Sequence, residues 1–166
     1  MAREQRYLIA LGSNMRHHSF GRPRQILRAA LDMLADEGLT IVRAASVIVT
    51  EPLGPSRRRY ANGAAVVQSL FAPEDLLDLL KRIERGFGRR AGGQRWTARV
   101  LDLDIVLWNG GCWSSPALTI PHPEFRHREF VLSPACTIAA DWRDPLTGLT
   151  LRQLQARLTR PRPLPR

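Results

Sequence analysis

Apolar segments and two helical patterns alternate along the chain in an order that few folds allow. Leucine and isoleucine recur at helical spacing in two places: between the first and second apolar runs, and between the third and fourth. The order strand–helix–strand–strand–helix–strand predicts an α+β, ferredoxin-like βαββαβ core with a mainly antiparallel sheet flanked by helices. The four strands are expected from runs bounded by turn residues, at 7–11, 39–49, 60–70 and 99–107.

Prolines mark where both helices of this core begin. Pro23 opens the first helix, which we expect to stop at Gly38, and Pro73 opens the second. Residues 50–59 and 86–99 are rich in proline or glycine and are expected to be loops.

The C-terminal third of the chain has weaker signals. Residues 117–142 predict a short strand, a loop and a helical turn, and residues 149–158 predict a last short helix. We therefore expect one domain over 1–158, followed by a disordered Pro/Arg-rich tail over 159–166.

The predicted strand RVLDLDIVL carries two aspartates, although aspartate is disfavoured in strands. Side chains two residues apart point to the same face, so Asp102 and Asp104 share one side at a separation of about 7 Å. Such carboxylates repel unless a cation lies between them, and Mg²⁺ binds one or two carboxylates together with substrate phosphates. The alternative is a strand with one solvent-facing side, and the neighbouring segments must decide between them.

Positive charge is concentrated just before these aspartates. The net charge is +10, almost wholly from arginine, since Lys81 is the single lysine. This charge predicts an anionic partner, either a nucleic acid or a small polyphosphate, although a GC-rich genome also favours arginine over lysine. Residues 81–99 hold seven cations against one acid, Glu84. A glycine-rich basic loop beside paired carboxylates is what phosphoryl transfer requires.

Two other segments offer binding groups. PHPEFRHREF, residues 121–130, gathers histidines and arginines that suit phosphates, although a structural histidine is an equal alternative. Tyr60 and Asn62 follow the TEPLGP loop, and together they could stack on and hydrogen-bond a flat ring. Trp96 either covers a heterocycle or packs on the core.

The sequence also argues against some classes of protein. It has no apolar run of about 18 residues, and its N-terminus lacks the apolar segment of a signal peptide. Cys112 and Cys136 show no metal-ligand spacing and are expected to be free thiols. We expect a cytoplasmic monomer with no membrane and no nucleic-acid partner.

Six motifs in order resemble one family. They are ALGSN (10–14), TEPLGP (50–55), YAN (60–62), RIE (82–84), RWTARVLDLDIVL (95–107) and IPHPEFRHREFVL (120–132). Together they resemble the 6-hydroxymethyl-7,8-dihydropterin pyrophosphokinases of folate biosynthesis. The resemblance covers about residues 7–140 and implies transfer of a pyrophosphoryl group from ATP, a co-substrate, to the pterin hydroxymethyl group, with release of AMP.

The resemblance also implies roles for individual residues. Asp102 and Asp104 would hold two Mg²⁺ ions. The pterin would be bound by Thr50, Leu53, Tyr60, Asn62 and Phe130. ATP would be bound by Glu84, Arg89, Arg95, Arg99, Ile105, His122 and Arg128, with Arg89, Arg95, Trp96 and Arg99 also serving catalysis.

Two other classes share parts of this pattern. An RNA-binding ferredoxin-like module fits the charge and the element order, but it calls for exposed aromatics where this chain has carboxylates. A metal-dependent nucleotidyltransferase also places two aspartates on such a sheet, but it would release pyrophosphate rather than AMP.

Overall fold

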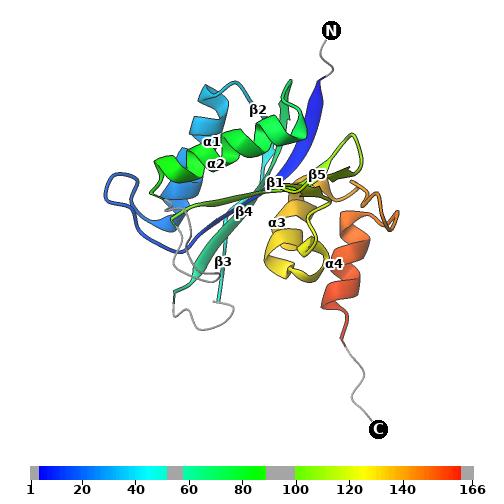
Figure 1. Cartoon of the computed structure of the whole chain (residues 1–166). Helices are drawn as coiled ribbons and strands as arrows, with labels where there is room; N and C mark the ends of the chain where they lie inside the picture. The colour runs from blue at the N-terminus through cyan, green and yellow to red at the C-terminus, as the bar shows by residue number, and fades with distance from the viewer. Residues whose placement is uncertain (1–3, 52–57, 89–99, 162–166) are drawn as a thin grey trace.

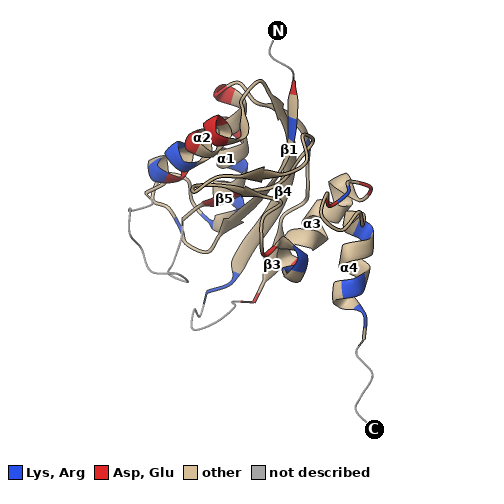
Figure 2. Cartoon of the chain, turned by 45° about the vertical axis from the view of Figure 1, so that its right-hand side comes forward, with Lys and Arg blue, Asp and Glu red and all other residues tan. Residues whose placement is uncertain are grey.

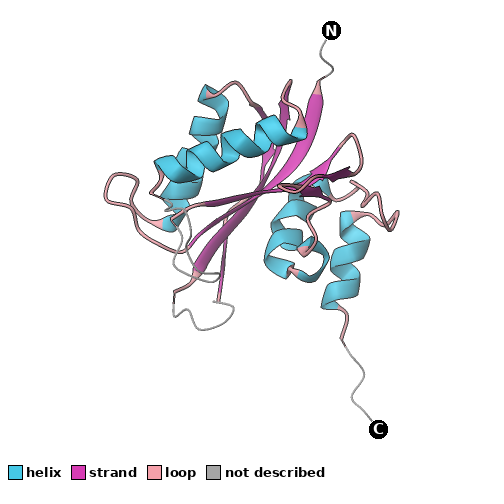
Figure 3. Ribbon diagram, in the orientation of Figure 1, coloured by secondary structure: helices cyan, strands magenta, loops and turns pink. Residues whose placement is uncertain are grey.

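The computed structural model describes residues 4–51, 58–88 and 100–161. Strands and helices alternate along the chain, as Figures 1 and 3 show. The strands are β1 (Gln5–Ser13), β2 (Thr40–Ala44), β3 (Ile48–Thr50), β4 (Tyr60–Ser69), β5 (Asp102–Trp108), β6 (Trp113–Ser114) and β7 (Thr119–Ile120). The helices are α1 (Pro23–Asp36), α2 (Pro73–Gly86), the 3-10 turn η1 (Phe125–His127), α3 (Glu129–Ala139) and α4 (Leu151–Thr159).

The main sheet has the order β2-β4-β1-β5, and all its pairs are antiparallel. β3 also pairs with β4, beyond the end of β2. This is the ferredoxin-like arrangement, so the predicted fold class is confirmed. The strand expected at 39–49 is divided into β2 and β3, because its pairing with β4 is interrupted between Ala44, which pairs with Ala65, and Ile48, which pairs with Asn62.

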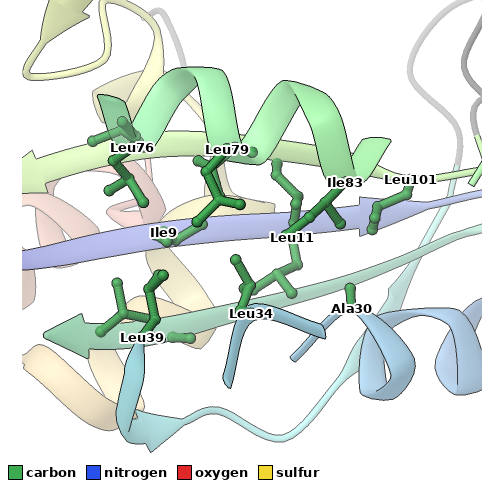
Figure 4. Close-up of a cluster of buried hydrophobic side chains, with 14 of the residues drawn as sticks. Ile9, Leu11, Ala30, Leu34, Leu39, Leu76, Leu79, Ile83 and Leu101 are labelled. Atoms are coloured by element: carbon green, nitrogen blue, oxygen red, sulfur yellow. The ribbon is translucent and has the colours of Figure 1, made fainter. Parts of the chain in front are cut away.

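One face of the sheet is covered by α1 and α2 (Figure 1). Ile9 and Leu11 of β1 point into this layer, where α1 contributes Leu34 and α2 contributes Leu76 and Ile83 (Figure 4). These side chains are at most a few per cent exposed. Apolar residues recur at every second position in the strands and at helical spacing in α1 and α2, and this pattern predicted the core correctly.

The opposite face is covered by α3, and α4 packs against α3 and η1 (Figure 1). Leu8 and Val106 of the sheet belong to one buried cluster with Leu132 of α3 and Leu151 of α4. The expectation of only a helical turn in this region was wrong, because α3 is an 11-residue helix. Its sequence is apolar on most sides and contains Pro134, so it lacks the one-sided pattern that reveals surface helices.

Three of the described helices, α1, α2 and α4, carry charged residues along their length (Figure 2). In the described ranges, no helix is long and apolar enough to cross a bilayer. The last helix runs to Thr159, one residue into the predicted tail, and residues 162–166 lie outside the described residues.

Candidate functional site

Three neighbouring strands contribute one row of residues beside the start of α3. Gly12 of β1 pairs with Asp102 of β5 on one side and with Asn62 of β4 on the other. In the adjacent row, Ala10 pairs with Asp104. Because Gly12 and Ala10 are small, the sheet surface between the carboxylates and the amide is low enough for a ligand to lie on it.

These residues form the floor of a cavity of about 570 Å³. Its walls come from the end of β3, the start of β4, the segment before α3 and the first turn of α3. The described lining residues are Ala10, Leu11, Gly12, Thr50, Glu51, Tyr60, Asn62, Asp102, Asp104, His122, Glu124, Arg128, Phe130 and Val131. The structure thus brings together the predicted metal ligands with predicted residues of both the pterin and the ATP sets.

The two aspartates face this cavity together, as the alternation along the strand predicted. Burial raises the pKa of Asp104, and the neighbouring charge of Asp102 raises it further, while His122, Lys81 and Arg128 act in the opposite direction. Two carboxylates in this setting favour a divalent cation, which would relieve their repulsion.

His122 lies next to Asp104, with its Nε2 4.0 Å from the Asp104 Oδ2 atom. Its backbone N–H donates to the carbonyl of Val106 in β5, and its Nδ1 accepts a hydrogen bond from the backbone N–H of Glu124. Burial lowers the pKa of His122, although Asp104 raises it. Because Nδ1 accepts the hydrogen bond from Glu124, the ring proton lies on Nε2, the nitrogen that faces the carboxylate.

The opposite wall carries the groups predicted to recognise a flat ring. Asn62 is buried, and its Nδ2 donates to the Thr50 Oγ1 at 2.7 Å. This bond fixes which end of the amide is the acceptor. Tyr60 and Phe130 also line the cavity, and the Arg128 guanidinium lies 5.8 Å from the centre of the Phe130 ring.

Two residues of the predicted ATP set do not reach the cavity. Glu84 is fully buried: it accepts a hydrogen bond from the Leu103 backbone N–H at 2.8 Å and pairs with Lys81. Its place in α2 beneath β5 gives its side chain a structural role, and the contact with ATP that the resemblance implies stays a prediction. The side chain of Ile105 lies in the core between the sheet and α1 and α2, which leaves only its backbone for a ligand.

Five predicted site residues lie outside the described residues: Leu53, Arg89, Arg95, Trp96 and Arg99. The described chain adds lining residues that the sequence did not single out. Among them, Glu51 and Glu124 bring negative charge to the rim. Glu51 lies in the motif TEPLGP and Glu124 in IPHPEFRHREFVL, so their position beside predicted site residues was the signal that could have identified them.

Within the three described stretches of chain, no group of three His, Cys, Asp or Glu side chains is arranged to hold a metal ion. A hard divalent cation such as Mg²⁺ takes one or two protein carboxylates and completes its coordination with substrate phosphates and water.

Comparison with known proteins identifies what this arrangement is similar to. Residues 8–140 match the family model described as 7,8-dihydro-6-hydroxymethylpterin-pyrophosphokinase (HPPK). The 2-amino-4-hydroxy-6-hydroxymethyldihydropteridine pyrophosphokinase of Pseudomonas aeruginosa is 39% identical over 143 residues, or 85% of each chain. The Synechocystis enzyme of the same name is 35% identical over 89% of this chain and 73% of its own length.

A solved structure supports the fold. The crystal structure of HPPK-DHPS from Plasmodium falciparum superimposes with a TM-score of 0.66 at 14% sequence identity. The match covers 93% of this chain but 43% of the other, so this chain spans less than half of that longer protein. At this identity the likeness concerns the fold alone.

Proposed function

We propose that this chain, which belongs to the 7,8-dihydro-6-hydroxymethylpterin-pyrophosphokinase family, carries out that family's reaction in the cavity beside Asp102 and Asp104. The reaction belongs to folate biosynthesis. The hydroxymethyl oxygen of the pterin attacks the β-phosphorus of ATP, the bond between that phosphorus and the α–β bridging oxygen breaks, and AMP leaves. The hydroxyl proton is released to solvent.

The single observation that carries the proposal is the row Asp102–Gly12–Asn62. It places a cation-binding pair and a buried amide on one surface, separated by a residue without a side chain. A ring hydrogen-bonded to Asn62 can lie over Gly12 and extend its hydroxymethyl group toward the carboxylates. This arrangement brings the nucleophile to the phosphates without any change of the sheet.

The family uses Mg-ATP, and the carboxylates of Asp102 and Asp104 fit the metal. We place two Mg²⁺ ions at this pair. When bound, Mg²⁺ neutralises phosphate charge and lowers the pKa of the attacking hydroxyl. The fit is supported by the raised pKa of Asp104, because burial and the charge of Asp102 disfavour its ionised form until a cation is present.

The chain's own residues orient the two substrates. His122 presents Nε2–H beside the carboxylates, and Arg128 lines the same cavity with its guanidinium 5.8 Å from the centre of the Phe130 ring, so each can donate to phosphate oxygens. Asn62, Thr50, Tyr60 and Phe130 line the other part and would hold the pterin. Arg89, Arg95, Trp96, Arg99 and Leu53 stay in the roles that the resemblance implies.

The proposal is tested by product analysis. The purified protein is mixed with ATP, Mg²⁺ and 6-hydroxymethyl-7,8-dihydropterin, and the phosphorus-containing products are followed by ³¹P NMR. AMP and a pterin diphosphate in equal amounts would support the assignment. Release of pyrophosphate would instead indicate a nucleotidyltransferase, and release of ADP would indicate single phosphoryl transfer.

Further parts of the proposal concern the protein's setting. We propose that it acts as a cytoplasmic monomer, which agrees with Cys112 and Cys136 being free thiols. We also propose that no nucleic acid binds it, since the carboxylate-bearing face would repel a phosphate backbone without metal. Salt-dependent binding of RNA in the absence of Mg²⁺ would count against this.

A further inference from the structure

A buried ion pair outside the cavity joins two segments that are 18 residues apart. The Arg126 guanidinium donates two hydrogen bonds to the Asp144 carboxylate, from Nε to Oδ2 and from Nη2 to Oδ1, both 2.7 Å long. Asp144 is fully buried, whereas the Arg126 side chain is 20% exposed. A bidentate pair of this kind fixes the direction of the arginine as well as its position.

Asp144 is itself held firmly from its own side. Its Oδ2 accepts a hydrogen bond from the Thr147 hydroxyl at 2.6 Å, and its Oδ1 accepts one from the Leu146 backbone N–H at 3.1 Å. The surrounding turn between α3 and α4 is closed by backbone hydrogen bonds from Asp144 to Leu149 and from Gly148 to Asp144. The carboxylate is therefore a rigid anchor that exists independently of Arg126.

Arg126 lies in η1, between two side chains that line the cavity, in the chain order His122, Arg126, Arg128. η1 is one short 3-10 turn. Its backbone hydrogen bonds from Phe125 to His122 and from Arg128 to Phe125 are both 3.3 Å long, and the bond from His127 to Glu124 is 3.1 Å long. A single 3-10 turn has poorer hydrogen-bond geometry than an α-helix and does little to hold itself in place. Side-chain contacts must supply the rest.

Two side-chain contacts hold the η1 turn in place from opposite directions. Phe125 is fully buried among the residues between the sheet and α3 and α4, and the Arg126 guanidinium lies 4.7 Å from the centre of its ring. Asp144 then holds the guanidinium in that place. The pair thus fixes the middle of a segment whose two ends carry His122 and Arg128 into the cavity.

We propose that Asp144 is a positioning residue: through Arg126 it sets the placement of His122 and Arg128, and so the affinity for the ATP phosphates. The inference rests on the proposed function, because it takes the anion at these residues to be the triphosphate. Neither Arg126 nor Asp144 is among the described residues that line the cavity. Apolar replacements of buried ion pairs often leave stability unchanged, but an apolar pair would not fix the direction of the side chain at 126.

The test compares Asp144→Asn with a matched control, Asp141→Asn. Asp141 lies in the same turn and pairs with Arg152, but at 3.5 Å and with both side chains largely exposed. Each variant is measured at a temperature well below its Tm. We expect Asp144→Asn to raise KM for ATP about tenfold to a hundredfold, as displaced supporting residues do. KM for the pterin should change less than twofold, and Asp141→Asn should behave as the unaltered protein.

A second readout does not depend on activity. Hydrogen exchange should accelerate in residues 122–128 of Asp144→Asn and stay unchanged in β1 and β4. If the unaltered protein produced no AMP, the proposed function would fail, while the exchange result would still decide whether Asp144 holds this segment. Normal exchange in 122–128 together with an unchanged KM for ATP would overturn the inference.

A merely structural role predicts a different result. It would lower the amount of active protein and hence the apparent kcat, with both KM values unchanged. Should Asp144→Asn fail to fold, Thr147→Val removes one hydrogen bond to the anchor and leaves the ion pair intact. That variant should show the same selective rise in KM for ATP, by a smaller factor, and equal changes in both KM values would contradict the inference.

Discussion

Asp102 and Asn62 face the same cavity from two strands that do not touch, because both pair with Gly12 of the strand between them. Backbone pairing fixes their separation, and both strands are supported from below by the core of α1 and α2. The two halves of the site, one for a cation and one for a ring, are thus held on one rigid surface. This arrangement leads to several expected outcomes.

Replacing Asp104 by asparagine should abolish turnover and raise the Tm of the ligand-free protein. Burial and the charge of Asp102 raise the pKa of Asp104. Because the folded-state pKa lies above the unfolded-state value, ionisation at neutral pH opposes folding, and a neutral amide removes that effect. Activity assays and thermal unfolding check both halves. Asp78→Asn, at an exposed position of α2, is the control and should change neither property. Near-normal turnover in Asp104→Asn would refute the metal-ligand role.

Gly12→Ala should weaken substrate binding without harming the fold. A Cβ at this position would lie 3.6 Å from the Asn62 Oδ1, an ordinary contact, but it would stand on the floor between the two halves of the cavity. We expect kcat/KM to fall about tenfold, or about 1.4 kcal/mol of transition-state stabilisation. Gly63→Ala is the control, since its Cβ would meet Leu27 on the opposite face at 3.7 Å. Equal kinetic effects in both variants would argue against a role for the cavity floor.

Phe130→Ala should weaken binding of the pterin more than binding of ATP. The ring lines the cavity near Thr50 and Tyr60, and loss of an aromatic contact costs about 0.5–1.5 kcal/mol beyond the buried area. Calorimetric titration with each ligand separately measures the two losses. Equal losses for the two ligands would count against stacking on the pterin.

Glu84→Gln should destabilise the protein and leave its affinity for ATP unchanged. The carboxylate accepts a hydrogen bond from Leu103 and pairs with Lys81 while fully buried, so its loss should cost about 1–3 kcal/mol. Urea unfolding measures the stability, and titration with ATP measures the affinity. A selective loss of ATP binding with normal stability would instead support the role in ATP binding that the resemblance implies.

Arg126→Met should lower stability at neutral pH but much less in acid. Burial alone would raise the pKa of Asp144, but hydrogen bonds from Arg126, Thr147 and Leu146 outweigh it and lower that pKa below its usual range. A carboxyl whose folded-state pKa is lowered stabilises the fold above its unfolded-state pKa and loses this effect as the pH falls through the folded-state value. The variant should therefore lose about 3 kcal/mol at pH 7. Urea unfolding of both proteins at several pH values should show this difference shrinking in acid, and a pH-independent difference would contradict the account.

The sequence predicted the parts of this fold that depend on the local spacing of apolar residues and on the prolines and glycines that end helices and strands. The element order followed from apolar runs with prolines and glycines between them, and the shared face of Asp102 and Asp104 followed from alternation along one strand. The division between β2 and β3 could not be predicted, because an interruption of pairing depends on the partner strand.

The features that the sequence did not predict have a common physical cause, which is that burial depends on tertiary packing. Glu84 sits among charged residues in the sequence, yet the fold buries it beneath β5, where it accepts a hydrogen bond from the Leu103 backbone N–H. The partnership of Arg126 with Asp144 joins two segments that nothing in either one identifies as neighbours. The α3 helix was underestimated because it is apolar on most sides and contains a proline.

The most direct test of the central claim is a crystal structure with Mn²⁺ in place of Mg²⁺, a non-hydrolysable ATP analogue and the pterin. We expect an anomalous scattering peak from a Mn²⁺ ion that is coordinated by oxygens of Asp102, Asp104 and the analogue's phosphates. The pterin ring should lie between Tyr60 and Phe130. A metal bound elsewhere, or phosphates seated away from these two carboxylates, would contradict it.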